Sequence, residues 1–289
     1  MLNNLMLWEN LREPQFPEAV EKSKGVCVIP IGAMEKHGPH LPVGTDNIIA
    51  ERTAHLAAEL EPVVVFPTFG FGHINGLQYT NGAICFSNKL MLNYLTELCR
   101  EIARSGFKKI LFLNAHGGNL PLLYTLCNSM REKKNDYVVM YANSFGTSPN
   151  DLRKAITENR EGFPYITDAD VTILEKYFEK PMQEGHADLD ELLLVHESRP
   201  ESVDLSVMDQ ENGESTHRTD HLGELGIYSG GMWIANFPNS FAGSFFPYAN
   251  ERLDKAYMQL RIDYIAKIYK AVKEDTELLK INDEWNKMW

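Results

Sequence analysis

The sequence has few cysteines, and none of them forms a Cys-x-x-Cys pair. Its 289 residues contain four, at Cys27, Cys85, Cys99 and Cys127. Cys27 and Cys85 lie within apolar or strand-like segments. Buried free thiols are therefore a better interpretation than disulfides, and the reducing cytoplasm is the expected compartment.

Long apolar runs and excess positive charge are also lacking. No stretch approaches the ~18 consecutive apolar residues of a membrane-spanning helix. The first residues carry neither a basic leader nor a small-residue cleavage site, so we expect neither a membrane partner nor a signal peptide. The 28 Lys and Arg residues are outnumbered by 40 Asp and Glu residues, which gives a net charge of −12. Nucleic acid is therefore not an expected partner, because phosphate binding needs clustered basic side chains.

Short apolar segments alternate with segments of helical periodicity in an otherwise ordinary globular composition. The apolar segments comprise residues 26–31, 63–66, 109–113 and 137–141. The helical patterns cover residues 47–60, 89–105, 120–133 and 250–280. Continuous apolar runs are typical of strands that are buried on both faces. The alternation predicts an α/β fold with a parallel sheet covered by helices on both sides.

The region between residues 143 and 250 has weaker patterns, with polar stretches and stretches rich in Gly, Pro and Asn. The length of the chain allows one large α/β domain or two small ones. We expect this region to wrap onto the same sheet, so that residues 1–289 form a single domain.

Glu35, His37 and Asp46 follow the first expected strand, at the sheet edge where open α/β sheets bind ligands. Glu35 and His37 are two residues apart, so they project to the same side of an extended stretch. The Gly and Pro residues after His37 permit a turn that brings Asp46 back beside them. Two carboxylates and an imidazole are suitable ligands for Zn²⁺, Mn²⁺ or Fe²⁺.

His116 follows the third expected strand and therefore lies at the same edge. The next residues, Gly117 and Gly118, let the backbone approach a ligand closely. The following helix would direct its free N–H groups to the same place. On the residues alone, a metal site and two ordinary polar turns are open alternatives.

Three segments resemble the motifs of the creatininase (creatinine amidohydrolase) family. The longest, Glu35-Lys36-His37-Gly38-Pro39-His40-Leu41-Pro42-Val43-Gly44-Thr45-Asp46, resembles the signature E-x-H-G-x-H-L-P-x-x-T-D. Residues 114–119 are similar to N-x-H-G-G-N, and Gly185-His186-Ala187 with Glu191 is similar to G-H-A-x-x-x-E-T-S. The resemblance implies a three-layer α/β/α sandwich with a mostly parallel central sheet, a binuclear metal hydrolase and a homohexamer.

The resemblance also implies a set of metal ligands. Glu35, Asp46 and His116 would hold one divalent ion, and His37 and Asp46 would hold the second, so that Asp46 bridges the two. In creatininase a carboxylate two residues after the equivalent of His116 completes the second site.

This chain has Gly118 at that position, so we expect Glu191 to act as the missing ligand and to take part in catalysis. Two other departures make creatinine an unsuitable substrate. The Thr-Ser that follows the Glu in the family is replaced by Leu192-Leu193, and the creatinine-packing Trp pair before His186 is missing.

The expected chemistry is hydrolysis of a small molecule by a metal-activated water. His186 would carry a proton to the leaving group, although a structural histidine is the alternative for this residue. We expect His73, Gly117 and His186 to contact the substrate, and His40 to support the turn of the first motif.

Three functions compete. The favoured one is hydrolysis of a small cyclic amide or related carbonyl compound. The second is hydrolysis of a carbon–carbon bond in a cyclic polyol ketone of the dehydro-inosose type. A pocket rich in hydroxyl-binding groups would favour this ketone, and an aromatic clamp would favour a flat amide ring. The third is a non-catalytic metal-binding scaffold.

Overall fold

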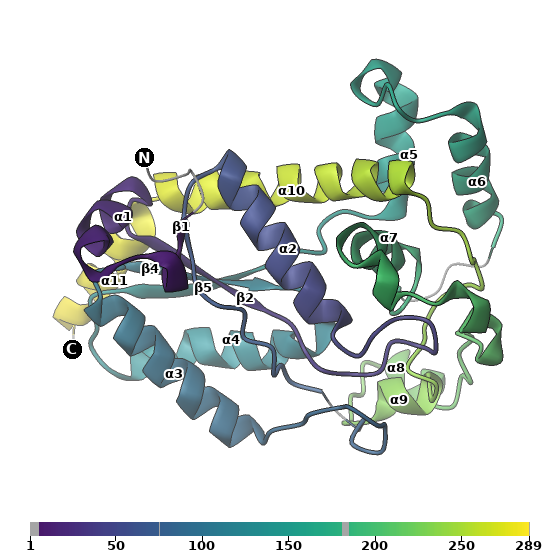
Figure 1. The fold of residues 1–289 in the computed structure, drawn as a ribbon. Helices are drawn as coiled ribbons and strands as arrows, with labels where there is room; N and C mark the ends of the chain where they lie inside the picture. Colours follow the sequence, from purple (N-terminus) through teal and green to yellow (C-terminus); the bar gives the residue numbers. More distant parts are fainter. Residues whose placement is uncertain (1–5, 75, 181–184, 289) are drawn as a thin grey trace.

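The computed structural model describes residues 6–74, 76–180 and 185–288. Within these residues, five strands form one sheet at the centre of the molecule, and all neighbouring pairs are parallel (Figure 1). The strands, in their order across the sheet, are β1 (Met6–Leu7), β3 (Val64–Val65), β2 (Val26–Ile31), β4 (Lys109–Asn114) and β5 (Val138–Asn143).

The central strands bury side chains on both faces of the sheet. Val28 and Leu111 pack into one hydrophobic cluster, whereas Ile29 and Phe112 pack into the other. Successive residues of a strand point to opposite faces, so each strand contributes to both clusters. This arrangement is the physical reason for the continuous apolar runs of β2 and β4.

Helices cover both faces of the sheet (Figure 1). One face is covered by α2 (Thr45–Leu60) and α10 (Glu251–Glu274), with α7 (Leu189–Ser198) packed against both. The other is covered by α3 (Asn88–Arg104) and α4 (Leu120–Ser129), together with α1 (Phe16–Lys22). The predicted three-layer α/β/α sandwich with a parallel central sheet is therefore confirmed.

The long helix expected over residues 250–280 is in fact two helices. α10 ends at Glu274, Asp275 adopts an extended conformation, and α11 (Glu277–Met288) begins two residues later. The Lys109 ammonium group contributes to this break, because it donates to the carbonyl oxygens of Val272 and Lys273 at 2.9 and 3.1 Å. The sequence has no glycine or proline at this break, so it could not be predicted from helix-breaking residues. Similarly, the pattern over residues 120–133 ends as an α-helix at Ser129 and continues as a 3-10 turn.

Several helices lie in the region where the sequence patterns are weak. They are α5 (Pro149–Glu158), α6 (Asp168–Phe178), α7, α8 (Asp220–Gly223) and α9 (Met232–Asn236). The 3-10 turns are Trp8–Asn10, Glu13–Gln15, Gly117–Asn119, Met130–Glu132, Arg160–Gly162, Pro200–Ser202 and Leu205–Gln210.

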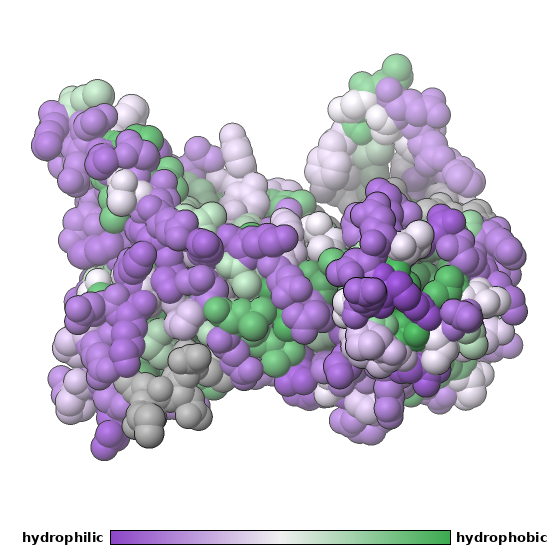
Figure 2. All heavy atoms as spheres, turned by 90° about the horizontal axis from the view of Figure 1, so that it is seen from above, coloured by the Kyte–Doolittle hydropathy of each residue, from purple (hydrophilic) through white to green (hydrophobic). Residues whose placement is uncertain are grey.

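One face of the molecule is mainly polar. Seen from above, from the side of α2 and α10, hydrophilic side chains cover most of the molecule and hydrophobic ones gather in small patches (Figure 2). Among the described residues, no helix combines the length and the apolar character that crossing a bilayer requires. The four cysteines are free thiols, and two of them, Cys27 and Cys99, are buried.

Candidate metal centre and active-site cavity

The loop after β2 places Glu35 and His37 at the carboxyl end of the sheet. The Glu35 amide donates to the carbonyl oxygen of Val43 at 3.0 Å, and His37 forms a bridge with Leu41 across a tight turn. Gly38 lies in this turn with a φ of 60°, which glycine adopts without strain. The turn returns the chain to α2, whose first turn carries Asp46.

His116 lies two residues beyond β4, at the same edge of the sheet. Its Nε2 lies 3.0 Å from the carbonyl oxygen of His73. A Cβ atom on Gly118 would lie 2.4 Å from His116 Nε2 and 2.5 Å from His73 O. A carboxylate-bearing residue at position 118 is thus incompatible with this backbone and with this placement of the imidazole.

Residues from the second half of the chain complete the centre. His186 pairs with Ala242 in a short antiparallel bridge, and Ala187 has a φ of 57°. The Ala187 amide donates to Glu191 Oε2 at 2.7 Å, so the turn before α7 holds this carboxylate in place. α7 begins directly after Asp188 and carries Glu191 in its first turn.

The five expected metal ligands converge on one region. Their ligand atoms fall into two overlapping groups, Glu35, Asp46 and His116, and His37, Asp46 and Glu191. His116 Nδ1 lies 2.9 Å from Glu35 Oε1 and 3.2 Å from Asp46 Oδ2. His37 Nε2 lies 3.3 Å from Asp46 Oδ1 and 3.6 Å from Glu191 Oε2. Asp46 therefore faces both groups, one with each oxygen.

Each histidine of the centre turns its outer nitrogen to a backbone carbonyl. His37 Nδ1 lies 3.1 Å from Glu35 O, and His186 Nε2 lies 3.1 Å from Lys36 O. A carbonyl only accepts hydrogen bonds, so these nitrogens, like His116 Nε2, are the donors. When these histidines are neutral, as metal binding requires, their inner nitrogens carry the lone pairs that a metal ion would take.

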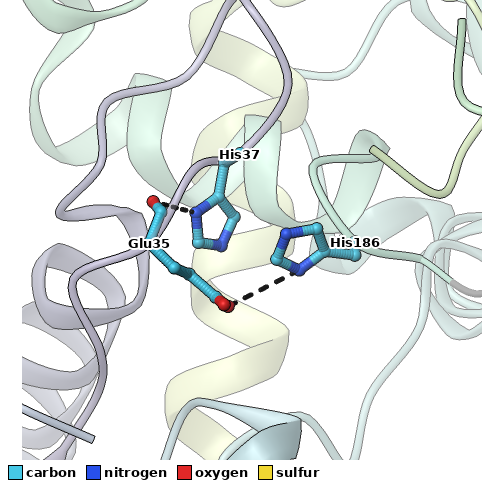
Figure 3. Close-up of side chains that lie close together, drawn as sticks. All are labelled: Glu35, His37 and His186. Atoms are coloured by element: carbon cyan, nitrogen blue, oxygen red, sulfur yellow. Dashed lines mark hydrogen bonds and ion pairs between the residues drawn. The ribbon is translucent and has the colours of Figure 1, made fainter. Parts of the chain in front are cut away.

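His186 lies at the rim of the same group. Its ring stacks on that of His37 with 4.2 Å between centroids, and its Nδ1 lies 3.9 Å from Glu35 Oε1. Figure 3 shows the two rings side by side, with the Glu35 carboxylate pointing towards His186. On its other side, His186 meets the edge of Trp233 at 5.0 Å between ring centroids.

The buried carboxylates create a strong demand for positive charge. Glu35 Oε1, both oxygens of Asp46 and His37 Nε2 are buried without a hydrogen-bond partner among the described residues. Burial opposes protonation of His37, but Asp46 and Glu191 together raise its pKa to about 10. Burial likewise opposes ionisation of Asp46, yet the neighbouring His37 and His116 hold its pKa below the usual range. Donors of these types without Lys or Arg partners fit divalent ions.

The pKa values of Glu191 and His186 are shifted so that each side chain favours its neutral form. Burial raises the pKa of Glu191 to about 8, although His37 opposes this shift. Burial and the charge of His37 lower the pKa of His186 to about 4. His186 is therefore neutral near pH 7, and its Nδ1 can accept a proton.

A cavity of about 720 Å³ adjoins the ligands. His73, Gly117 and His186, the expected substrate contacts, all line it. A Cβ atom on Gly117 would meet nothing within 4 Å, so Gly118 and not Gly117 is the position that requires glycine. His40 is buried outside the cavity, where its Nε2 lies 3.0 Å from Ala187 O and connects the first motif to the third.

The sequence patterns gave no indication of several residues at the site. Trp233, Ser144 and Arg261 line the cavity. Ser240 donates from its hydroxyl to Lys36 O at 2.7 Å and lies 3.2 Å from His186 Nε2. The only signal in the sequence was the Gly/Pro/Asn-rich composition of residues 229–250, which include Trp233 and Ser240 and were recognisable as a loop.

Comparison with known proteins identifies the family. The family model of creatinine amidohydrolase matches residues 9–256, so the chain belongs to the creatininase family. The expected family membership is thereby confirmed.

Curated relatives of the chain carry different activities. A mycofactocin precursor peptide peptidase from Mycobacterium tuberculosis is 33% identical over 119 residues, 38% of this chain and 47% of the relative. A pyrimidine monophosphate deformylase from Methanobrevibacter smithii is 32% identical over 126 residues, 41% of this chain and 50% of the relative. A 3-dehydro-scyllo-inosose hydrolase from Thermotoga maritima is 28% identical over 100 residues, 33% of this chain and 31% of the relative. The chain thus spans half or less of the length of these relatives.

Solved structures share the fold over almost the whole chain. A candidate creatinine amidohydrolase from Bacteroides fragilis has a TM-score of 0.70 at 22% identity, covering 95% of this chain and 99% of its own. A creatininase has a TM-score of 0.68 at 16% identity, covering 94% of this chain and 99% of its own.

Proposed function

We propose that this protein is a binuclear metal-dependent hydrolase that acts on a small cyclic amide or a related carbonyl compound. The observation that carries the proposal is the convergence of inward-facing histidine nitrogens and unpartnered carboxylate oxygens beside a cavity. Family membership supports it, because relatives with hydrolase, peptidase and deformylase names match 33% to 41% of the chain.

The ligand roles follow from the two groups. Glu35, His116 and one oxygen of Asp46 would hold one ion, while His37, Glu191 and the other oxygen of Asp46 would hold the second. Zn²⁺, Mn²⁺ and Fe²⁺ suit this mixture of nitrogen and oxygen donors. Solved creatininases include a Zn–Zn form and a Mn form.

Two divalent ions held there would lower the pKa of a water molecule and polarise the carbonyl group that is cleaved. His186 acts as the proton carrier. Its Nε2–H remains on Lys36 O, so its free Nδ1 takes a proton from the attacking water and transfers it to the leaving nitrogen.

We also propose that residues 1–289 form one domain, that the protein assembles as a homohexamer and that it works in the cytoplasm. Packing of α7 and α10, from the second half of the chain, against α2 supports the single domain. Free cysteines support a reducing compartment.

Metal analysis combined with a hydrolysis assay tests the function. Protein purified without chelator should contain about two divalent ions per chain and hydrolyse at least one member of a panel of lactams, hydantoins and formamides. Chelation should abolish hydrolysis, and Zn²⁺ or Mn²⁺ should restore it. Protein that binds no ion even after these metals are added would contradict the proposal, and full metal content without any turnover would favour the scaffold.

A further inference from the structure

The cavity is lined by polar residues other than the expected metal ligands. Besides metal ligands and apolar side chains, its lining includes Arg261 of α10, Asp190 of α7 and Ser144 at the end of β5. Arg261 and Ser144 lie outside the three sequence motifs, and Asp190 occupies a variable position of the third. The cavity is therefore polar at positions for which the metal centre provides no explanation.

Arg261 is a buried cation, with 2% of its surface exposed. Its guanidinium group is held rigidly: Nε donates to Thr147 Oγ1 at 2.7 Å and one terminal nitrogen donates to Ser144 O at 2.9 Å. The other terminal nitrogen donates to Thr147 O and to the Tyr257 hydroxyl at 3.0 and 2.7 Å. No described carboxylate lies within ion-pair distance of it. A guanidinium has five N–H groups, so one donor is left over.

Asp190 and Ser144 supply the complementary groups. Asp190 lines the same cavity and forms no ion pair with any described residue. The Ser144 hydroxyl is buried and lacks a hydrogen-bond partner in the described part of the chain. A buried polar group without a partner is costly. A bound molecule that reaches these groups would remove that cost.

We propose that Arg261, Asp190 and Ser144 form a subsite for a neutral part of the substrate that carries adjacent hydroxyl groups. A hydroxyl group can accept a hydrogen bond from the spare guanidinium N–H and donate one to the Asp190 carboxylate. A carboxylate on the substrate would only accept, and an ammonium group would only donate. A substrate carboxylate would face Asp190, Asp188 and Glu191 in the same lining, and a substrate cation would face Arg261. The apolar wall that includes Ile74, Leu77 and Trp233 suits the C–H faces of a saturated ring.

This inference rests on the proposed function, since it assigns the part of the substrate that is not cleaved. It favours a hydroxylated ring over a flat amide ring among the substrates considered above.

Calorimetric titration of the metal-loaded full-length protein with myo-inositol, N-methylhydantoin and glutarate tests the subsite. We expect myo-inositol to bind. Asp190→Asn and Ser144→Ala should each weaken this binding about tenfold, because each removes one hydrogen bond to the ligand. Asp263→Asn is the matched control, because this exposed carboxylate on α10 pairs only with Gln259 among the described hydrogen bonds. Arg261 is left intact, since its four hydrogen bonds also support the fold.

Absence of myo-inositol binding, equal binding by Asp190→Asn, or preferential binding of glutarate or the hydantoin would overturn the subsite. Metal content is measured on the same samples. Myo-inositol binding by protein that takes up no ions even when Zn²⁺ or Mn²⁺ is added would leave the subsite standing and remove the hydrolase function. Two bound ions and hydrolysis without myo-inositol binding would remove only the subsite.

Discussion

Asp46 is the residue that both halves of the proposed metal centre share. Its two oxygens lie 3.3 Å from His37 Nε2 and 3.2 Å from His116 Nδ1. Asp46→Asn should therefore release both ions and lower hydrolysis more than about 100-fold, whereas His37→Ala should release one. Elemental analysis after gel filtration measures the difference. Two ions bound to Asp46→Asn with near-normal affinity would show that this residue does not bridge them.

In the proposed centre, Glu191 substitutes for the carboxylate that Gly118 cannot supply. Its Oε2 lies 3.6 Å from His37 Nε2 and also accepts the Ala187 amide. Glu191→Gln keeps the shape and this hydrogen bond but removes the charge, so it should lose one of two ions and hydrolysis while the circular dichroism spectrum stays unchanged. Asp188→Asn is the comparison, because Asp188 bonds to Tyr177 and should retain both ions. Retention of two ions by Glu191→Gln would leave Glu191 outside the ligand set.

Ser240 positions His186 from outside the cavity. Its hydroxyl contacts both Lys36 O and His186 Nε2, and its backbone has a φ of 49°. Ser240→Ala should lower kcat about tenfold with little change in KM, since supporting partners of a site typically contribute 10- to 100-fold. Ser240→Gly removes the same hydroxyl but tolerates this φ. If kcat falls equally in both variants, loss of the hydroxyl is the cause. If Ser240→Gly keeps full activity, the loss in Ser240→Ala comes from strain in the backbone at this φ.

The sequence predicted the contiguous part of the site better than the dispersed part. Glu35, His37 and Asp46 are close in sequence, and one turn accounts for their approach. His186 and Glu191 were predicted only from the family resemblance. Ser240 and Arg261 reach the site through the packing of a loop and of α10, which no local pattern encodes.

At the scale of secondary structure, prediction succeeded where hydrophobic periodicity decides the structure. β2 and β4 are buried on both faces, so their apolar runs are unmistakable. α5 and α6 were not predicted, although each begins with a capping box, Ser148 with Asp151 and Thr167 with Asp170. Their N-terminal signals were readable. Both helices are short and rich in charged residues, so the apolar face of each was hard to recognise in the sequence.

The start of α6 supplies a prediction on stability. The Asp170 carboxylate accepts from Arg252 Nε at 2.7 Å and from the Thr167 amide at 2.8 Å. The hydrogen bond from Arg252 holds the pKa of Asp170 well below its usual range, against the effect of burial. Asp170→Asn should lower the melting temperature at pH 7 by about 2–4 °C.

The sign of the pH dependence follows from the lowered pKa. A carboxylate with a lowered pKa in the folded state stabilises the fold above its unfolded pKa of about 3.9, and this contribution disappears as the pH falls towards the folded value. The difference in melting temperature between wild type and Asp170→Asn should therefore shrink from pH 7 to pH 3, measured by calorimetry on chelated protein. If the difference in melting temperature stayed the same from pH 7 to pH 3, the charge of Asp170 would not be its cause.

At the scale of the whole molecule, both halves of the chain build the same core. Leu192 and Leu193 of α7 join Val28 and Leu111 of the sheet in one hydrophobic cluster. The pair Leu192-Leu193, which departs from the family motif, is thus buried packing and not a surface for substrate. A core shared in this way predicts one cooperative unfolding transition for residues 1–289.

The last prediction concerns assembly. Large apolar side chains are exposed on neighbouring helices of one face, with Leu90 and Tyr94 of α3 53% exposed and Tyr124 of α4 64% exposed. Exposed apolar groups that lie together favour association, and family resemblance makes a hexamer the expected form. Light scattering at micromolar concentration should give six times the 32.9 kDa of one chain. Tyr94→Glu combined with Tyr124→Glu should reduce this mass, whereas Tyr228→Glu, 76% exposed on another segment, is the control. A wild-type mass of one chain would contradict the assembly, and an unchanged hexamer in the double variant would place the contact elsewhere.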